Sequence, residues 1–203
     1  MTDDDTLPIF PLGTVLFPDG VLALRVFEAR YLDMVSECLR RDAPFGVCLI
    51  TRGGEVGEAA EHEAVGCEAR IMDWDAEQSG VLLIRARGGR RLRVLDRKLQ
   101  PDRLIRASVE RIEPDADLPV PDAFGDCVEL LRNAIDRHFR DTPSPNRRMV
   151  WEPCDYDSAA WVGNRLSELL PIAPGTRQKL MALTDPLARL ALVAGHLRRQ
   201  PAR

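Results

Sequence analysis

The sequence predicts an α+β protein, because strand patterns fill the first part of the chain and helix patterns fill the rest. Up to about Pro114, short segments rich in Val, Ile and Leu are bounded by Gly, Pro and Asp, as in the strands of a small barrel or sandwich. The stretch EPDADLPVPD, residues 113–122, has no apolar period and is typical of a linker. We therefore expect a β-barrel subdomain over residues 1–118 and an α-helical subdomain over residues 119–203.

The β-rich part begins with two strand lengths of apolar residues and becomes amphipathic at FEARY, residues 27–31. From there, apolar side chains recur at the spacing of one helical face, and these are Phe27, Tyr31, Met34, Val35, Cys38 and Leu39. This spacing predicts one helix inserted among the strands. Further strands are expected at residues 45–50, 65–74, 80–87, 90–96 and 104–113.

The second part carries the start and stop signals of several helices. A first helix is expected where Phe124, Cys127, Val128, Leu131, Ile135 and Phe139 keep a helical spacing. Asp157 or Ser158 can cap a second helix that runs to Leu170, and a short third helix follows Pro174. Asp185 and Pro186 are typical of the cap and first residue of a last helix, which would end at the cations Arg198 and Arg199.

The composition indicates a soluble globular protein and names no partner by itself. Hydrophobic residues make up 45% of the chain, charged residues 30%, and the net charge is −4. No secretory signal and no apolar run of about 20 residues is present, so we expect a cytoplasmic protein that does not enter a membrane. The five cysteines include no C-x-x-C pair, which favours free and mostly buried thiols.

Signatures of catalysis are missing from the sequence. It contains no phosphate-binding G-x-x-x-x-G-K-[ST], no G-x-G-x-x-G and no G-x-S-x-G, and only two lysines. Glu61, His62 and Glu63 near Cys67 come closest to a metal site, but a solvated loop explains them better because no second pair of ligands completes a tetrahedral set. We therefore expect no enzyme, no cofactor and no metal.

An arginine-rich segment gives a second candidate for function. A three-residue loop at residues 88–90 would pair Arg87 with Arg91 and Arg85 with Arg93, and would leave the apolar residues on the other face. These four arginines would then share one exposed surface. Such a surface can be solvated, can meet acidic groups of the same chain, or can bind an anion or RNA.

Three quoted segments carry a resemblance to a known family. PLGTVLFPDGVLALRVFEARYLDMVSECL, FGVCLI and VGCEARI resemble the N-terminal, substrate-binding domain of the Lon protease family, in particular its small stand-alone bacterial members without the ATPase and protease domains. The C-terminal LSELLPIAPGTRQKLMALTDPLARLALVAGHL is similar to the helical end of that domain. The resemblance implies a PUA-like β pseudo-barrel followed by a C-terminal helical bundle. It also implies a non-catalytic binding or adaptor module for unfolded or tagged polypeptide or a protein partner; an RNA- or anion-binding module is the alternative.

Two interpretations of the FEARY motif remain open. In the structural one, Phe27 and Tyr31 dock the helix on the barrel, Glu28 favours the first helical turn, and Arg30 pairs with a carboxylate. In the functional one, these residues border a groove for a peptide. The candidate binding residues are therefore Phe27, Glu28, Arg30 and Tyr31, and the alternative anion-binding set is Arg85, Arg87, Arg91 and Arg93.

Overall fold

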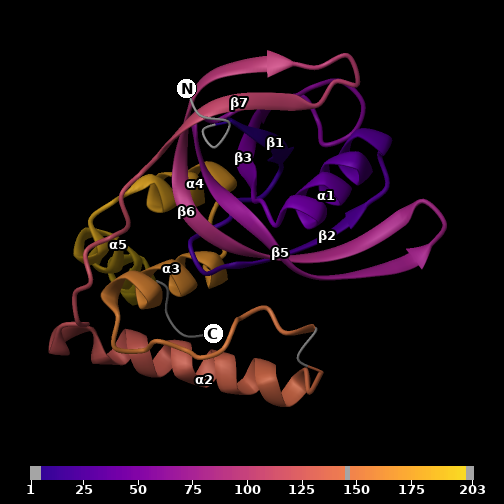
Figure 1. The fold of residues 1–203 in the computed structure, drawn as a ribbon. Helices are drawn as coiled ribbons and strands as arrows, with labels where there is room; N and C mark the ends of the chain where they lie inside the picture. The colour runs from indigo at the N-terminus through magenta and orange to yellow at the C-terminus, as the bar shows by residue number, and fades with distance from the viewer. Residues whose placement is uncertain (1–5, 145–146, 200–203) are drawn as a thin grey trace. The chain divides into compact units, whose positions relative to one another are not determined.

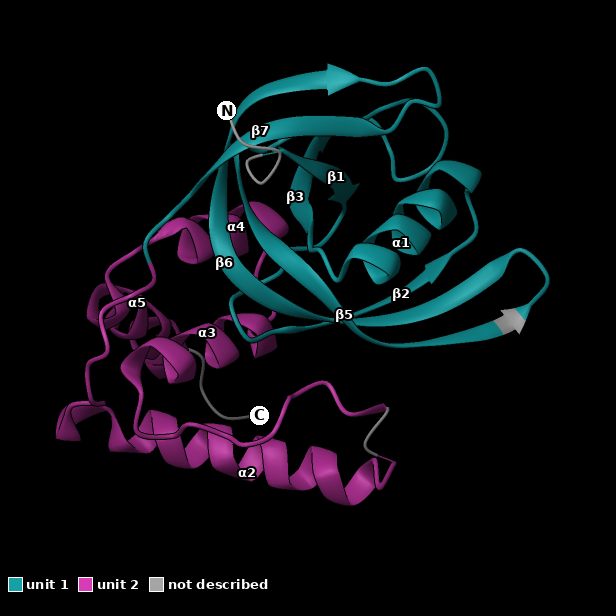
Figure 2. Cartoon of the chain, viewed as in Figure 1, with its two compact units in different colours: residues 1–113 teal, residues 114–203 magenta. Residues whose placement is uncertain are grey.

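The structure is a computed structural model that describes residues 6–144 and 147–199 (Figure 1). Its described residues form a mixed α/β fold with one mostly antiparallel sheet and five α-helices, which confirms the predicted α+β class. The chain divides into two compact units, residues 1–113 and 114–203 (Figure 2). None of the described helices is both long and apolar enough to cross a membrane.

The described residues of the first unit form seven strands and one helix. The elements are β1 (Thr6–Leu12), β2 (Val21–Val26), α1 (Ala29–Arg41), β3 (Phe45–Arg52), β4 (Glu61–His62), β5 (Val65–Gln78), β6 (Val81–Leu99) and β7 (Ile105–Arg111). Strand pairing runs from β1 through β7, β6, β5 and β3, and a parallel pairing of β3 with β1 closes this circuit. β2 lies off the circuit and pairs with the first part of β6.

Helix α1 covers the larger of two apolar clusters in this unit. Tyr31, Met34, Val35 and Cys38 are buried in it, as the helical spacing predicted. The other members lie on the strands and the turn after β1, among them Phe10, Leu16, Phe45, Ile84 and Ala86. A second cluster consists of Leu7, Ile9, Cys48, Leu92, Ile105, Ala107 and Val109. Ile84 and Leu92 of the same strand therefore belong to different clusters.

The predicted three-residue loop at residues 88–90 is wrong, because β6 is one continuous strand of 19 residues. Pairing with β5 shifts register between Cys67 and Ala69, which face Arg91 and Gly88 respectively. Such a bulge places an extra residue in one strand and reverses the alternation of its side chains beyond it. Glycine is nevertheless required at position 88, because there is no room for a side chain. A Cβ atom added there would lie 1.9 Å from the carbonyl oxygen of Phe17, in the turn that crosses β6.

The second unit is helical, with most boundaries close to the predicted ones. It contains the 3-10 helix η2 (Asp122–Phe124) and the helices α2 (Gly125–Asp141), α3 (Ala159–Leu169), α4 (Pro174–Ala182) and α5 (Pro186–Arg199). Ser158 caps α3 by accepting a hydrogen bond from the Trp161 backbone at 3.2 Å. Asp185 accepts bonds from the backbones of Leu187 and Ala188 at the start of α5. Both predicted caps are confirmed.

The acidic stretch before η2 is fixed within the second unit. Leu118 and Val120 exchange backbone hydrogen bonds of 2.9 Å with residues 157–159, at the entrance of α3. Asp115 forms an ion pair of 2.6 Å with the fully buried Arg189 of α5. The predicted linker is therefore a packed segment.

The predicted state of the cysteines is confirmed, since all five are free and four are buried. Burial raises the pKa of Cys38 to about 11 and that of Cys48 to about 12, so both thiols stay protonated near neutral pH. These cysteines serve as small apolar side chains of the core.

Candidate functional site

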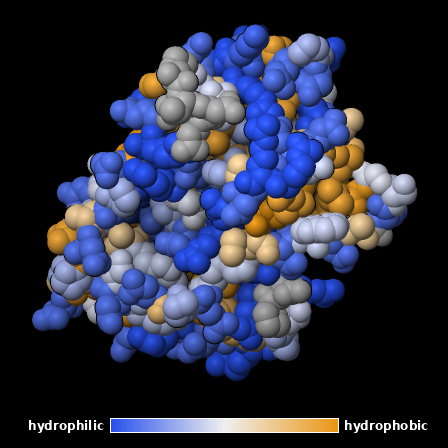
Figure 3. Space-filling view, viewed as in Figure 1, coloured by the Kyte–Doolittle hydropathy of each residue, from blue (hydrophilic) through white to orange (hydrophobic). Residues whose placement is uncertain are grey.

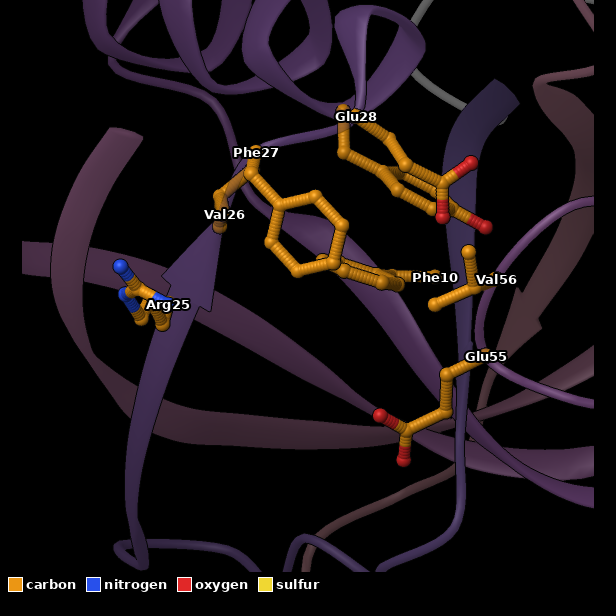
Figure 4. Close-up of a pocket in the computed structure, with 8 residues that line it drawn as sticks. Phe10, Arg25, Val26, Phe27, Glu28, Glu55 and Val56 are labelled. Atoms are coloured by element: carbon orange, nitrogen blue, oxygen red, sulfur yellow. The ribbon is translucent and has the colours of Figure 1, made fainter. Parts of the chain in front are cut away.

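A small pocket lies in the first unit where β2 meets α1 (Figure 4). It is lined by Phe10, Arg25, Val26, Phe27, Glu28, Tyr31, Glu55 and Val56. Its volume is about 40 Å³, whereas pockets for drug-sized molecules occupy roughly 300–1,000 Å³. The pocket can therefore hold the end of one side chain, but not a metabolite.

Two stacked aromatic rings form a fixed part of the pocket wall. The rings of Phe10 and Tyr31 lie 3.8 Å apart at an angle of 15°, and both residues are buried. Phe45 packs behind Phe10 with ring centroids 6.2 Å apart. Because neighbouring core residues hold both rings, this wall needs little reordering when something binds against it.

Two apolar side chains on the rim of the pocket are open to solvent, beside the charged residues Arg25, Glu28 and Glu55. Phe27 is 51% exposed and Val56 is 62% exposed. Figure 4 shows Phe27 and Phe10 turned toward the same hollow, with Val56 across from Phe27 and Arg25 apart from them. Figure 3 shows apolar residues gathered on this side of the molecule, beside α1 and β2 of Figure 1.

Arg30 lies behind the pocket and does not line it. Its guanidinium pairs with Glu28 at 2.9 Å, donates to the Arg103 carbonyl at 3.3 Å, and lies 4.7 Å from the centre of the Tyr31 ring. These contacts fix the Glu28 carboxylate at the pocket and place the guanidinium over the face of the Tyr31 ring. Burial raises the pKa of Tyr31 above its usual value, against the opposing effect of Arg30, so the phenol stays neutral.

The loop between β3 and β4 supplies the far side of the rim. Gly53 and Gly57 adopt positive φ values of 96° and 90°, which glycine permits without strain. Between them, Glu55 accepts a hydrogen bond from the Gly13 backbone at 2.7 Å. Glu58 pairs with Arg103 at 2.6 Å. These two contacts tie the loop to the rest of the unit and hold Val56 at the pocket.

Three of the four candidate residues predicted from the sequence meet at this pocket, namely Phe27, Glu28 and Tyr31. The structural interpretation holds for Tyr31, which is buried, and for Arg30, which pairs with a carboxylate. It is wrong for Phe27, because this residue precedes α1 and is half exposed.

Sequence reasoning missed the other five lining residues, Phe10, Arg25, Val26, Glu55 and Val56. The one available signal was Val56, a single large apolar residue in the polar segment RGGEVGE, where nothing local can bury it.

The predicted common face of four arginines is wrong. Arg91 is 2% exposed and pairs in register with Cys67, as a consequence of the bulge. Arg87 pairs with Asp19 at 2.5 Å, Arg93 pairs with Glu110 at 3.4 Å, and Arg85 lies opposite Asp73 on β5. Acidic side chains of the same unit therefore lie beside Arg85, Arg87 and Arg93.

A wider hollow of about 370 Å³ lies beside β4 and β6, and it is lined mainly by polar residues such as Thr51, Glu61, Asp96 and Arg97. His62 also lines it and donates from Nδ1 to the Glu63 carbonyl at 2.8 Å. Burial lowers the pKa of His62, which keeps the ring neutral at physiological pH. Among the described residues, no group of three or more His, Cys, Asp or Glu side chains is placed to hold a metal.

The first unit thus presents a pocket of side-chain size with two exposed apolar residues at its rim. Comparison with known families supplies the class of protein: the chain belongs to the family of the ATP-dependent protease La (LON) substrate-binding domain, whose model matches residues 6–199. The match is to the substrate-binding domain of Lon and not to its protease domain.

One solved structure supports this assignment, and a second shares the fold. The chain is 38% identical to a Lon N-terminal domain protein from Xanthomonas campestris, with a TM-score of 0.73 over 97% of this chain and 99% of that one. The N-terminal domain of a Mycobacterium avium complex Lon protease is 13% identical and shares the fold, with a TM-score of 0.63 over 96% of this chain and 99% of that one. No curated protein matches the sequence.

Proposed function

We propose that this protein is a non-catalytic adaptor that binds unfolded or tagged polypeptide at the pocket of Phe10, Phe27, Tyr31 and Val56. Membership of the Lon substrate-binding family supports a role in substrate recognition. Following the resemblance to that family, we also propose that the first unit is a PUA-like pseudo-barrel and that the second unit is a helical bundle.

The observation that carries the proposal is a pair of exposed apolar side chains beside a buried pair of stacked aromatic rings. Phe27 and Val56 are exposed, whereas Phe10 and Tyr31 are buried and stacked. A folded protein hides most of its large apolar side chains, but an unfolded chain presents them singly and in any order. A pocket for the end of one apolar side chain therefore selects unfolded polypeptide over folded protein and over polar metabolites.

The surface charges do not favour the alternative function of RNA binding. A nucleic-acid site needs cations gathered on one face, because phosphate contacts supply most of the affinity. Here the arginines of β6 lie among Asp19, Asp73 and Glu110.

Replacing Phe27 with alanine should weaken polypeptide binding by about tenfold, as expected for an aromatic anchor at an interface. The measurement is a fluorescence anisotropy titration with reduced, carboxymethylated lactalbumin, which is permanently unfolded. The matched control is Leu99→Ala, since Leu99 is 54% exposed at the end of β6, away from the pocket residues in sequence. Equal affinities of the two variants, or no binding by the parent protein, would contradict the proposal.

A further inference from the structure

Strand β2 has a free edge that leads directly to the pocket. It pairs with β6 over six consecutive residues, from Val21 opposite Arg87 to Val26 opposite Leu82, without a register shift. No other strand among the described residues pairs with it. In an antiparallel strand, alternate residues turn their backbone N–H and C=O groups away from the neighbour. Half of the backbone groups of β2 therefore face outward from the sheet.

A second open edge, on the distal half of β5, is protected. β3 pairs with β5 only as far as Ala69, which leaves residues 70–78 without a partner on that side. The pairing of this part with β6 shifts register between Ile71 and Asp73 and again between Ala76 and Gln78. Bulges and charged side chains such as Asp73 and Asp75 are the means by which proteins block unwanted strand pairing.

The edge of β2 is less protected, because its pairing with β6 has no register shift and one charged residue stands on it. Its sequence VLALRV contains no proline, and Arg25 is its one charged residue. Leu22 and Val26 point into the core and hold the strand flat against it. A strand of this kind is a ready template for an extended chain.

Continuity with the pocket indicates what this edge binds. β2 ends at Val26, and the next two residues, Phe27 and Glu28, line the pocket (Figure 4). An extended segment that pairs with β2 therefore passes the pocket at one end. One of its side chains can enter the hollow between Phe27 and Val56, while its backbone bonds to the outward groups of β2.

We infer that polypeptide binds to this protein as an added strand on β2, with one aromatic or large aliphatic side chain in the pocket. This inference rests on the proposed function and specifies its mode. Backbone pairing supplies affinity without regard to sequence, and the pocket sets the register.

Backbone methylation of a peptide tests this mode, because an N-methyl group removes one hydrogen-bond donor and blocks that edge. The probes are two synthetic peptides of alternating leucine and threonine, of the six-residue length of β2. One carries phenylalanine and lysine after the repeat, to suit a strand parallel to β2, and the other carries lysine and phenylalanine before it, to suit an antiparallel strand; the tighter binder is used as the unmethylated peptide. Two further peptides carry N-methyl groups on alternate residues, in the two complementary sets. Because the phenylalanine fixes the register, one set should weaken binding to the full-length protein by roughly tenfold to a hundredfold. The other set should leave the affinity unchanged.

Hydrogen exchange with the unmethylated peptide adds a second readout. Exchange should slow at alternate amides of Val21–Val26 and stay unchanged at residues 70–78 of β5. Equal affinity of the unmethylated peptide and both methylated peptides, loss of binding with both methylated sets, or no slowing in β2 would overturn strand addition.

The controls separate this inference from the proposed function. If unfolded lactalbumin binds in a Phe27-dependent way while the peptides fail these tests, polypeptide recognition stands and strand addition is wrong. If neither lactalbumin nor the parent peptide binds, the proposed function itself fails.

Discussion

Replacing Asp115 with alanine will lower the free energy of unfolding by about 3–5 kcal/mol, the usual result of removing one partner of a buried ion pair. The carboxylate lies 2.6 Å from Arg189, and the exposed fractions of the two side chains are 5% and 0%. Arg189 also donates to the backbone carbonyls of Leu180 and Leu183. These bonds keep the charged guanidinium in its buried position when Asp115 is replaced. The variant must therefore bury an unbalanced guanidinium or open the contact between α4 and α5.

The matched control is Glu113→Ala, two residues earlier in the chain. Glu113 pairs with Arg90 at 3.5 Å and is 90% exposed, so its loss should change the free energy of unfolding by about 1 kcal/mol or less. Urea denaturation followed by circular dichroism measures both variants. Equal midpoints for Asp115→Ala and Glu113→Ala would show that the buried pair does not hold the second unit together.

Replacing Gly88 with alanine will cost about 3 kcal/mol, at the upper end of the range for overpacked sites. The added Cβ would lie 1.9 Å from the Phe17 carbonyl oxygen and 3.0 Å from the carbonyl carbon, both of which are backbone atoms. The turn cannot move away freely, because Asp19 and Gly20 exchange backbone hydrogen bonds with Gly88. A loss of this size corresponds to a fall in Tm of roughly 6–12 °C for a chain of this length.

Gly175→Ala serves as the opposite control in a thermal melt. Nothing lies within 4 Å of a Cβ at Gly175, which is in α4, so alanine there should leave Tm unchanged or raise it slightly. If the Gly88→Ala variant has the same Tm as the parent protein, the turn at Phe17 does not lie as close to β6 as described.

Features of the fold that depend on nearby residues could be predicted from the sequence. Ser158 and Asp185 cap helices because each side chain reaches amides two or three residues ahead, and such signals lie wholly within one segment. The buried face of α1 follows in the same way from the spacing of Tyr31, Met34, Val35 and Cys38.

Features that depend on distant segments could not be predicted. Gly88 and Gly89 favour a turn when only their neighbours are considered, but Gly88 is needed because the turn at Phe17 crosses the strand 71 residues away in sequence. Phe27 fits the helical spacing of a core residue, yet it precedes α1 and stays exposed. The pocket was only partly predictable for the same reason. Phe10 and Val56 reach it from other parts of the chain, and no local pattern brings them to FEARY.

Photo-crosslinking from the pocket tests most directly the central claim, that unfolded polypeptide binds where β2 meets α1. A benzophenone amino acid is placed at Val56, on the exposed rim, and in a matched variant at Leu99, which is similarly exposed on β6. After irradiation with carboxymethylated lactalbumin, the account predicts strong crosslinking from position 56, weak crosslinking from position 99, and competition by the unlabelled polypeptide. Equal crosslinking from both positions, or none from position 56 under conditions where the polypeptide is bound, would contradict it.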